Sequence, residues 1–90
     1  MGKVGIMRNL VTLYSRHGCH LCEVALEVLE TLAVELDFEV ETIFIEDDPD
    51  LVEKHGEFVP VIYLDGEPHD FYRVNVERFR TSLAQHRLHQ

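Results

Sequence analysis

The stretch Leu10–Cys22, with the sequence LVTLYSRHGCHLC, joins a short apolar run to two cysteines spaced as Cys-x-x-Cys. The run Leu10–Tyr14 is rich in strand formers and predicts a buried strand. From His20 to Leu36 the apolar residues recur at spacings of three and four, which predicts an amphipathic helix. The first cysteine therefore falls where a strand gives way to a helix.

Two further elements are predicted in the middle of the chain. Phe38–Ile45 alternates its side chains between two faces, as a strand does. Asp48 and Pro49 are favoured at a helix start, and Gly56 at a helix end, so a short helix is expected to run to about His55.

The last third of the chain predicts a hairpin and a final helix. Pro60–Leu64 and Glu67–Tyr72 flank Asp65-Gly66, a pair favoured in two-residue type I′ turns. Asn75 is a suitable N-cap for the helix that follows. The expected core residues of that helix are Val76, Phe79 and Leu83.

The element order strand, helix, strand, helix, strand, strand, helix indicates the α/β class. The first strand–helix–strand unit should be parallel and right-handed, and the hairpin adds antiparallel strands to the same sheet. We expect a four-stranded mixed sheet flanked by three helices, in one domain spanning 1–90 with flexible termini at 1–8 and 88–90. Cys19 then lies at the carboxyl end of a central strand, where ligands and chemistry collect in such sheets.

The composition describes a folded and acidic chain. Hydrophobic residues make up 46% and charged residues 28%, which argues against disorder. No apolar run approaches the roughly 20 residues that span a bilayer, and the start, MGKVGIMRNL, lacks the apolar stretch of a signal peptide. A cytoplasmic location is expected. The net charge of −9 opposes binding to nucleic acid or anionic membranes, so neither is expected as a partner.

The cysteine pair favours redox chemistry. Two cysteines cannot build a disulfide-rich secreted framework, and so small a loop adds little as a structural crosslink. The attacking species in disulfide exchange is a thiolate. A helix start lowers the free energy of forming a thiolate, because unpaired N–H groups and the positive end of the helix dipole stabilise the negative charge. Cys19 is therefore the predicted nucleophile. Cys22 lies one turn further, on the apolar stripe, and is predicted to resolve the mixed disulfide.

Residues 14–22, YSRHGCHLC, resemble the active-site entry of glutaredoxins, within the thioredoxin-like superfamily, and Phe58-Val59-Pro60 resembles their Thr-Val-Pro loop. The similarity covers about residues 10–86 and is greatest to small glutaredoxin-like proteins of bacteria. It implies a thioredoxin-like fold and a thiol–disulfide oxidoreductase without cofactor, active in electron transport and cell redox homeostasis. It also implies a cis peptide bond before Pro60, with the Val59 backbone contacting an extended substrate.

Two neighbours of the cysteines are predicted to support them. Arg16 matches a position where glutaredoxins commonly carry a lysine that favours the thiolate and the glutathione carboxylate; the alternative is an ordinary surface arginine. His20 replaces the proline or glycine usual in the family. If protonated, it would stabilise the thiolate and make the couple more oxidising, and the alternative is an exposed turn residue.

One stretch departs from the glutaredoxin pattern. Many glutathione-using members carry a Gly-Gly pair after the hairpin, whereas this chain has Pro68–Tyr72, with the sequence PHDFY. Phe71 is expected to crowd the groove. The sequence therefore favours a protein reductase over glutathione as the electron source, with protein or small-molecule disulfides as substrates and the chain as a monomer.

Two other functions stay open at this point. His17, Cys19, His20 and Cys22 lie within six residues and are of types that bind zinc or iron–sulfur clusters. Four ligands this close rarely converge without a second ligand group, so no metal is assigned. Of the 17 acidic residues, 13 fall between Glu23 and Glu57 and are expected to form a solvated acidic face. This acidic face and the missing glycine pair are also compatible with a redox-inert interaction module.

Overall fold

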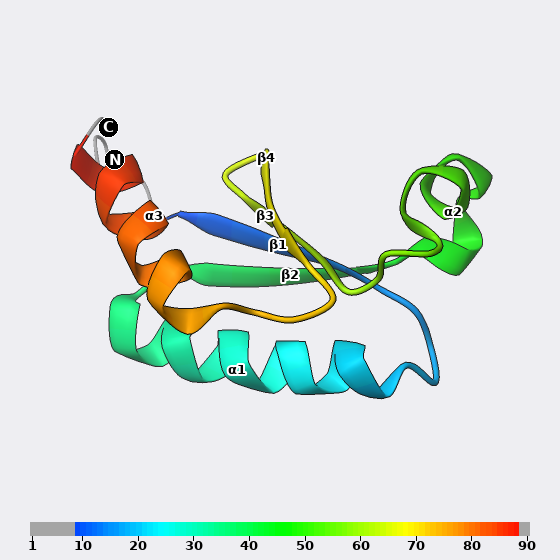
Figure 1. The fold of residues 1–90 in the computed structure, drawn as a ribbon, viewed down its shortest axis with the longest axis horizontal. Helices are drawn as coiled ribbons and strands as arrows, with labels where there is room; N and C mark the ends of the chain where they lie inside the picture. Colours follow the sequence, from blue (N-terminus) through cyan, green and yellow to red (C-terminus); the bar gives the residue numbers. More distant parts are fainter. Residues whose placement is uncertain (1–8, 89–90) are drawn as a thin grey trace, which may run out of the picture.

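A computed structural model describes residues 9–88 and contains the predicted elements in the predicted order (Figure 1). Their bounds are β1 (Leu10–Ser15), α1 (His20–Leu36), β2 (Glu39–Phe44), the 3₁₀ turn η1 (Ile45–Asp47), α2 (Pro49–His55), β3 (Val61–Leu64), β4 (Glu67–Phe71) and α3 (Val76–Leu88). Of the termini expected to be flexible, residues 1–8 and 89–90 lie outside the described residues. Leu88 instead closes α3, whose last turn is anchored because Arg87 donates hydrogen bonds to Asn9 Oδ1 (2.8 Å) and to the Asp37 carbonyl (2.9 Å).

The four strands form one mixed sheet in the order β2-β1-β3-β4. β1 pairs in parallel with β2, and antiparallel pairing joins β1 to β3 and β3 to β4. This topology, with its helices, confirms the predicted α/β class and thioredoxin-like fold. β1 is a central strand, so its carboxyl end, which leads to Cys19, is flanked by strands on both sides.

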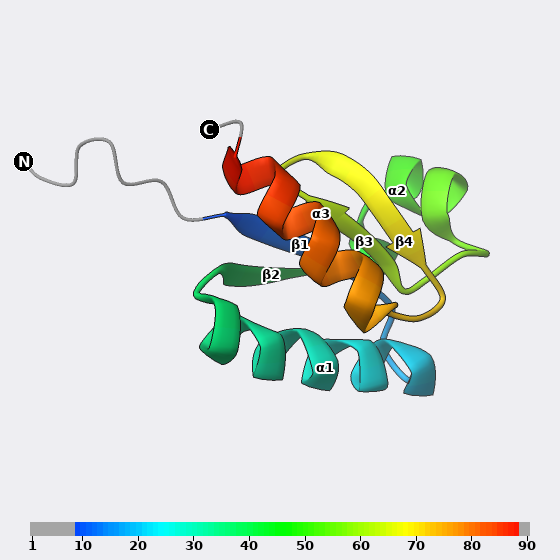
Figure 2. The ribbon, with the colours of Figure 1, turned by 60° about the vertical axis from the view of Figure 1, so that its left-hand side comes forward.

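The two faces of the sheet carry different layers. Figure 2 shows α1 and α3 together on one side of the sheet and α2 on the other. Alternation along β1 sends Leu13 into the main core, where it meets Leu29 of α1 and Phe79 of α3. The next residue, Tyr14, points to the opposite face and packs against His55 of α2, with ring centroids 4.6 Å apart.

Local signals account for the helix and turn positions. Asp48 accepts a hydrogen bond from the N–H of Asp50 at the start of α2, and Asn75 accepts one from the N–H of Arg78 at the start of α3. In the β3–β4 turn, Asp65 and Gly66 have φ values of 50° and 86°, as a type I′ turn requires.

The end of α2 has a different basis from the one expected. Gly56 has a right-handed φ of −54°, so its role is not to adopt a left-handed cap. A Cβ at this position would collide with the carbonyl oxygen of Val52. Glycine is therefore required by the close approach of the backbone to the preceding turn.

The predicted strand bounds were too long at four ends, the first of which is Phe38, the residue before β2. Ile45 is fully buried but belongs to η1 rather than β2, because the chain bends there and the Asp48 N–H bonds to the Ile45 carbonyl (3.0 Å). Pro60 precedes β3, and Tyr72 follows β4 with a left-handed backbone. Within residues 9–88, no helix is long and apolar enough to cross a membrane.

Candidate redox site

Cys19 and Cys22 are joined by a disulfide at the start of α1, with their Cα atoms 5.2 Å apart. Cys19 is the N-cap residue: its Sγ accepts a hydrogen bond from the Cys22 N–H (3.2 Å), and its carbonyl accepts one from Glu23 (3.1 Å). The helix thus directs an N–H group at the Cys19 sulfur. The same donor would stabilise a thiolate on Cys19 after reduction.

The two sulfurs differ in accessibility. Cys22 is 2% exposed and lies on the buried stripe of α1 with Ala25 and Leu29, whereas Cys19 is only partly buried. Cys19 is therefore the more accessible of the two cysteines. The division of roles predicted from the spacing stays a prediction.

The turn before the cysteines is held by contacts to β2 and η1. The ring of His17 stacks on Phe44 with centroids 4.0 Å apart, and its backbone N–H donates to Glu46 Oε2 (2.8 Å). Desolvation alone would raise the pKa of Glu46, but hydrogen bonds from the backbone N–H groups of His17 and Glu46, together with the His17 ring, give a net lowering. His17 is thus anchored on η1.

The two predicted supporting residues occupy different places. Arg16 is exposed, and its Nη2 would lie 3.6 Å from a Cβ placed on Gly56, so its charge lies at the carboxyl-terminal end of α2. A helix carboxyl end attracts a cation. His20 is the exposed first residue of α1, directly beside Cys19 in the chain. For the described part of the chain, the structure gives neither side chain a hydrogen bond or ion pair to the cysteines.

The Val59–Pro60 peptide bond is cis, which confirms the expectation drawn from the Phe-Val-Pro resemblance. Tyr14, near the end of β1, pairs with Val61, so the Val59–Pro60 segment lies at the same end of the sheet as the turn that carries Cys19. Pro60 is buried and Val59 is half-buried. Among residues 9–88 the Val59 backbone has no hydrogen-bond partner, which leaves its N–H and C=O available to another chain.

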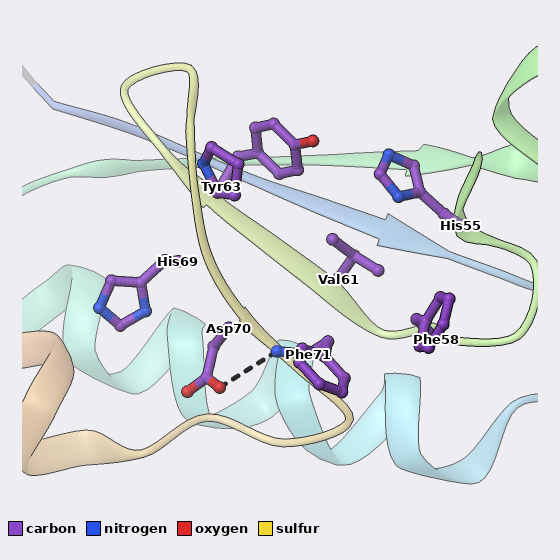
Figure 3. Close-up of a pocket in the computed structure, with 8 residues that line it drawn as sticks. His55, Phe58, Val61, Tyr63, His69, Asp70 and Phe71 are labelled. Atoms are coloured by element: carbon purple, nitrogen blue, oxygen red, sulfur yellow. Dashed lines mark hydrogen bonds between the residues drawn. The ribbon is translucent and has the colours of Figure 1, made fainter.

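Aromatic side chains surround this segment. Phe58, Phe71 and Tyr72 are 44%, 51% and 43% exposed, and Phe58 meets Phe71 edge-to-face at 5.7 Å. Figure 3 shows Phe58 and Phe71 at the end of a pocket of about 410 Å³ between the β3–β4 hairpin and the end of α2. The pocket is lined by His55, Phe58, Val61, Tyr63, Pro68, His69, Asp70 and Phe71.

The two histidines in this pocket have lowered pKa values. Burial lowers the pKa of His55, and the charge of Lys54 lowers it further. Burial also lowers the pKa of His69, with a further contribution from Arg78. Burial therefore favours the neutral form of both rings.

A metal site is not assembled in the described part of the chain, where no group of three or more His, Cys, Asp or Glu side chains is placed to hold an ion. The four residues considered for such a site do not converge, because the His17 ring stacks on Phe44 and its Nδ1 lies 3.2 Å from Glu46. The cysteine sulfurs are bonded to each other.

Residues 10–84 match the family model of the glutaredoxin-like domain (DUF836). The chain belongs to this family. Uncharacterized proteins of Mycobacterium tuberculosis and Mycobacterium bovis are each 34% identical to this glutaredoxin-like chain over 83 residues, which is 87% of this chain and 86% of theirs.

Two solved structures resemble this glutaredoxin-like protein. The solution structure of protein Ne2328 from Nitrosomonas europaea has a TM-score of 0.77 and 25% identity, and the match covers 91% of this chain and 98% of that one. A crystal structure of the X. campestris protein XcR50 has a TM-score of 0.65 and 31% identity, covering 83% and 96%. These matches support the recognised family and its fold.

Sequence reasoning missed the part played by Tyr72, which was placed in a strand, and by Phe58, which was noted only as part of a loop. Tyr72 meets the Phe58 ring at 6.2 Å and contacts the backbone on both sides of Val59. An exposed aromatic residue beside a turn is common in any sequence. No local signal marks this role of Tyr72, because its partners around Val59 lie 12 to 15 positions away and its one neighbouring partner is the Phe71 ring.

Proposed function

We propose that this glutaredoxin-like protein is a thiol–disulfide oxidoreductase. The Cys19 thiolate attacks a substrate disulfide, forming a Cys19–substrate disulfide and releasing one substrate sulfur as a thiol. The Cys22 thiolate then attacks the Cys19 sulfur, which releases the second thiol and leaves the Cys19–Cys22 disulfide. An external dithiol returns the pair to the reduced state and is itself oxidised to a disulfide.

The observation that carries this proposal is the position of the disulfide at the start of α1. The Cys22 N–H already donates to the Cys19 sulfur. Cys22 is only 2% exposed, whereas Cys19 is only partly buried. A structural crosslink needs no such asymmetry between its two sulfurs. An attacking and a resolving cysteine do, because the second must stay shielded until the mixed disulfide forms.

The proposed partners are polypeptides. Exposed apolar side chains gather at the end of the molecule that carries the disulfide: Leu21 and Val24 on the first turns of α1, and Phe58, Phe71 and Tyr72 around the cis peptide. Exposed apolar patches of this kind mark protein interaction sites. We propose a protein dithiol as the reductant, a monomeric chain and a reducing, cytoplasmic setting.

The test of this function is catalytic reduction of a polypeptide disulfide. With dithiothreitol as the electron source and insulin as the substrate, the protein should accelerate precipitation of the reduced insulin chains well beyond dithiothreitol alone. The matched control is the Cys19→Ser, Cys22→Ser double variant, which lacks both thiols and whose folding is checked by circular dichroism. Equal rates for the protein and this control would refute the proposed activity.

His20 is expected to tune the redox couple because it lies beside the nucleophile at the helix start. His20→Pro should raise the pKa of the Cys19 thiol and make the potential more negative by roughly 30 mV, which is about 1.4 kcal/mol for two electrons. The measurements are thiolate absorbance against pH and equilibration with glutathione buffers. His17→Gln is the control, since His17 is anchored on η1. Identical potentials for wild type and His20→Pro would make His20 a bystander.

A further inference from the structure

Tyr72 has a backbone conformation that side chains rarely adopt. It directly follows β4 and has a left-handed φ of 71° although it is not glycine. Such a conformation persists only where the surroundings hold it, and it is found preferentially at functional sites. The contacts that hold Tyr72 therefore indicate what its conformation serves.

Apart from the ring of the adjacent Phe71, whose centroid lies 4.9 Å away, those contacts are made to the segment around the cis peptide. The Tyr72 N–H donates to the Pro60 carbonyl (2.8 Å), and its hydroxyl donates to the Glu57 carbonyl (3.0 Å). The two hydrogen bonds bracket Phe58 and Val59 from either side. The Tyr72 ring also lies near the Phe58 ring, so backbone and side chain act on the same four residues.

The backbone of Val59, which lies between these two hydrogen bonds, has no hydrogen-bond partner within the described chain. The carbonyls of Glu57 and Pro60 are taken by Tyr72. The segment is thus fixed at both ends and open at Val59. An extended polypeptide placed beside Cys19 would meet an edge whose position is already set.

We propose that Tyr72 is a positioning residue that sets the affinity of the redox site for polypeptide disulfides. The inference rests on the proposed oxidoreductase function and adds the residue that orients its substrate. Tyr72 holds Glu57–Pro60 in place, so that the free Val59 backbone pairs with the substrate chain. A small disulfide has no extended backbone to pair with Val59 and gains nothing from this arrangement.

The variant Tyr72→Phe tests the proposal because it removes the hydroxyl bond to Glu57 and keeps the ring. We expect KM for a polypeptide disulfide to rise roughly three- to tenfold, as the loss of one hydrogen bond predicts, with kcat unchanged. For bis(2-hydroxyethyl) disulfide both constants should stay at the wild-type values. Tyr63→Phe is the matched control. It also removes a tyrosine hydroxyl, but Tyr63 lines the neighbouring pocket and its hydroxyl makes no hydrogen bond to the Glu57–Pro60 segment.

A second measurement does not depend on activity. Hydrogen exchange in a peptide covering residues 57–61 should be faster in Tyr72→Phe than in wild type, and unchanged in Tyr63→Phe. If the wild-type protein reduces no disulfide, the proposed function fails, while unaltered exchange in Tyr72→Phe would show that Tyr72 does not hold the segment. In an active protein, an unchanged polypeptide KM, or equal losses for both substrates, overturns the positioning role.

Discussion

Cys19→Ser is expected to lower disulfide reduction to the uncatalysed rate, whereas Cys22→Ser is expected to trap the substrate on Cys19. A serine hydroxyl is not ionised at neutral pH and cannot attack a disulfide. With Cys22 replaced, Cys19 still has the helix start and its accessibility, so the first attack proceeds. The second attack has no thiol, and the mixed disulfide accumulates.

Mass spectrometry of each variant after mixing with a disulfide substrate measures this difference. Cys22→Ser should gain the mass of one substrate thiol, and Cys19→Ser should gain none. In the reduced wild-type protein, an alkylating agent at neutral pH should modify Cys19 faster, because Cys22 is 2% exposed. Faster modification of Cys22 would reverse the assignment.

Glutathione is expected to reduce this protein at least about tenfold more slowly than a dithiol protein does, a difference of about 1.4 kcal/mol in the barrier. Residues 68–72 replace the glycine pair of glutathione-using glutaredoxins, and they include Phe71. The Phe71 ring is 51% exposed and packs on Phe58 at the rim of the site. The net charge of −9 also repels an anionic tripeptide. The one nearby cation considered for its carboxylate, Arg16, lies beside Gly56 at the end of α2.

The comparison uses steady-state turnover with glutathione and glutathione reductase against turnover with a thioredoxin and thioredoxin reductase. Varying the salt concentration separates the steric effect of Phe71 from the charge repulsion. Salt screens the repulsion, with a Debye length of about 8 Å at physiological ionic strength, but leaves Phe71 in place. The Phe71→Ala variant should improve turnover with glutathione. Efficient, saturable turnover of the wild type with glutathione would contradict this prediction and assign the protein to glutathione-dependent chemistry.

Several features followed from the sequence because their signals are local. The bounds of α1, His20–Leu36, agree with the apolar periodicity, and Asp48 and Asn75 cap the helices that they were predicted to begin. The Asp65-Gly66 turn has the two positive φ values its type requires. Each of these is decided by residues within a few positions, through side-chain spacing or a cap, so the order of elements and the place of the cysteines were predictable.

Other features were decided only by the tertiary structure, because their partners are distant in the chain. Arg16 had no local signal for its place beside Gly56, and His17 none for its place on Glu46, 29 positions away. Tyr72 was predicted to end a strand, yet it reaches across 15 positions to Glu57 and turns the backbone left-handed. The sequence by itself determined where the cysteine pair lies, since a cysteine pair at a helix start is a local arrangement. Folding determined what surrounds them, since those contacts form only when the sheet brings the hairpin beside the end of β1.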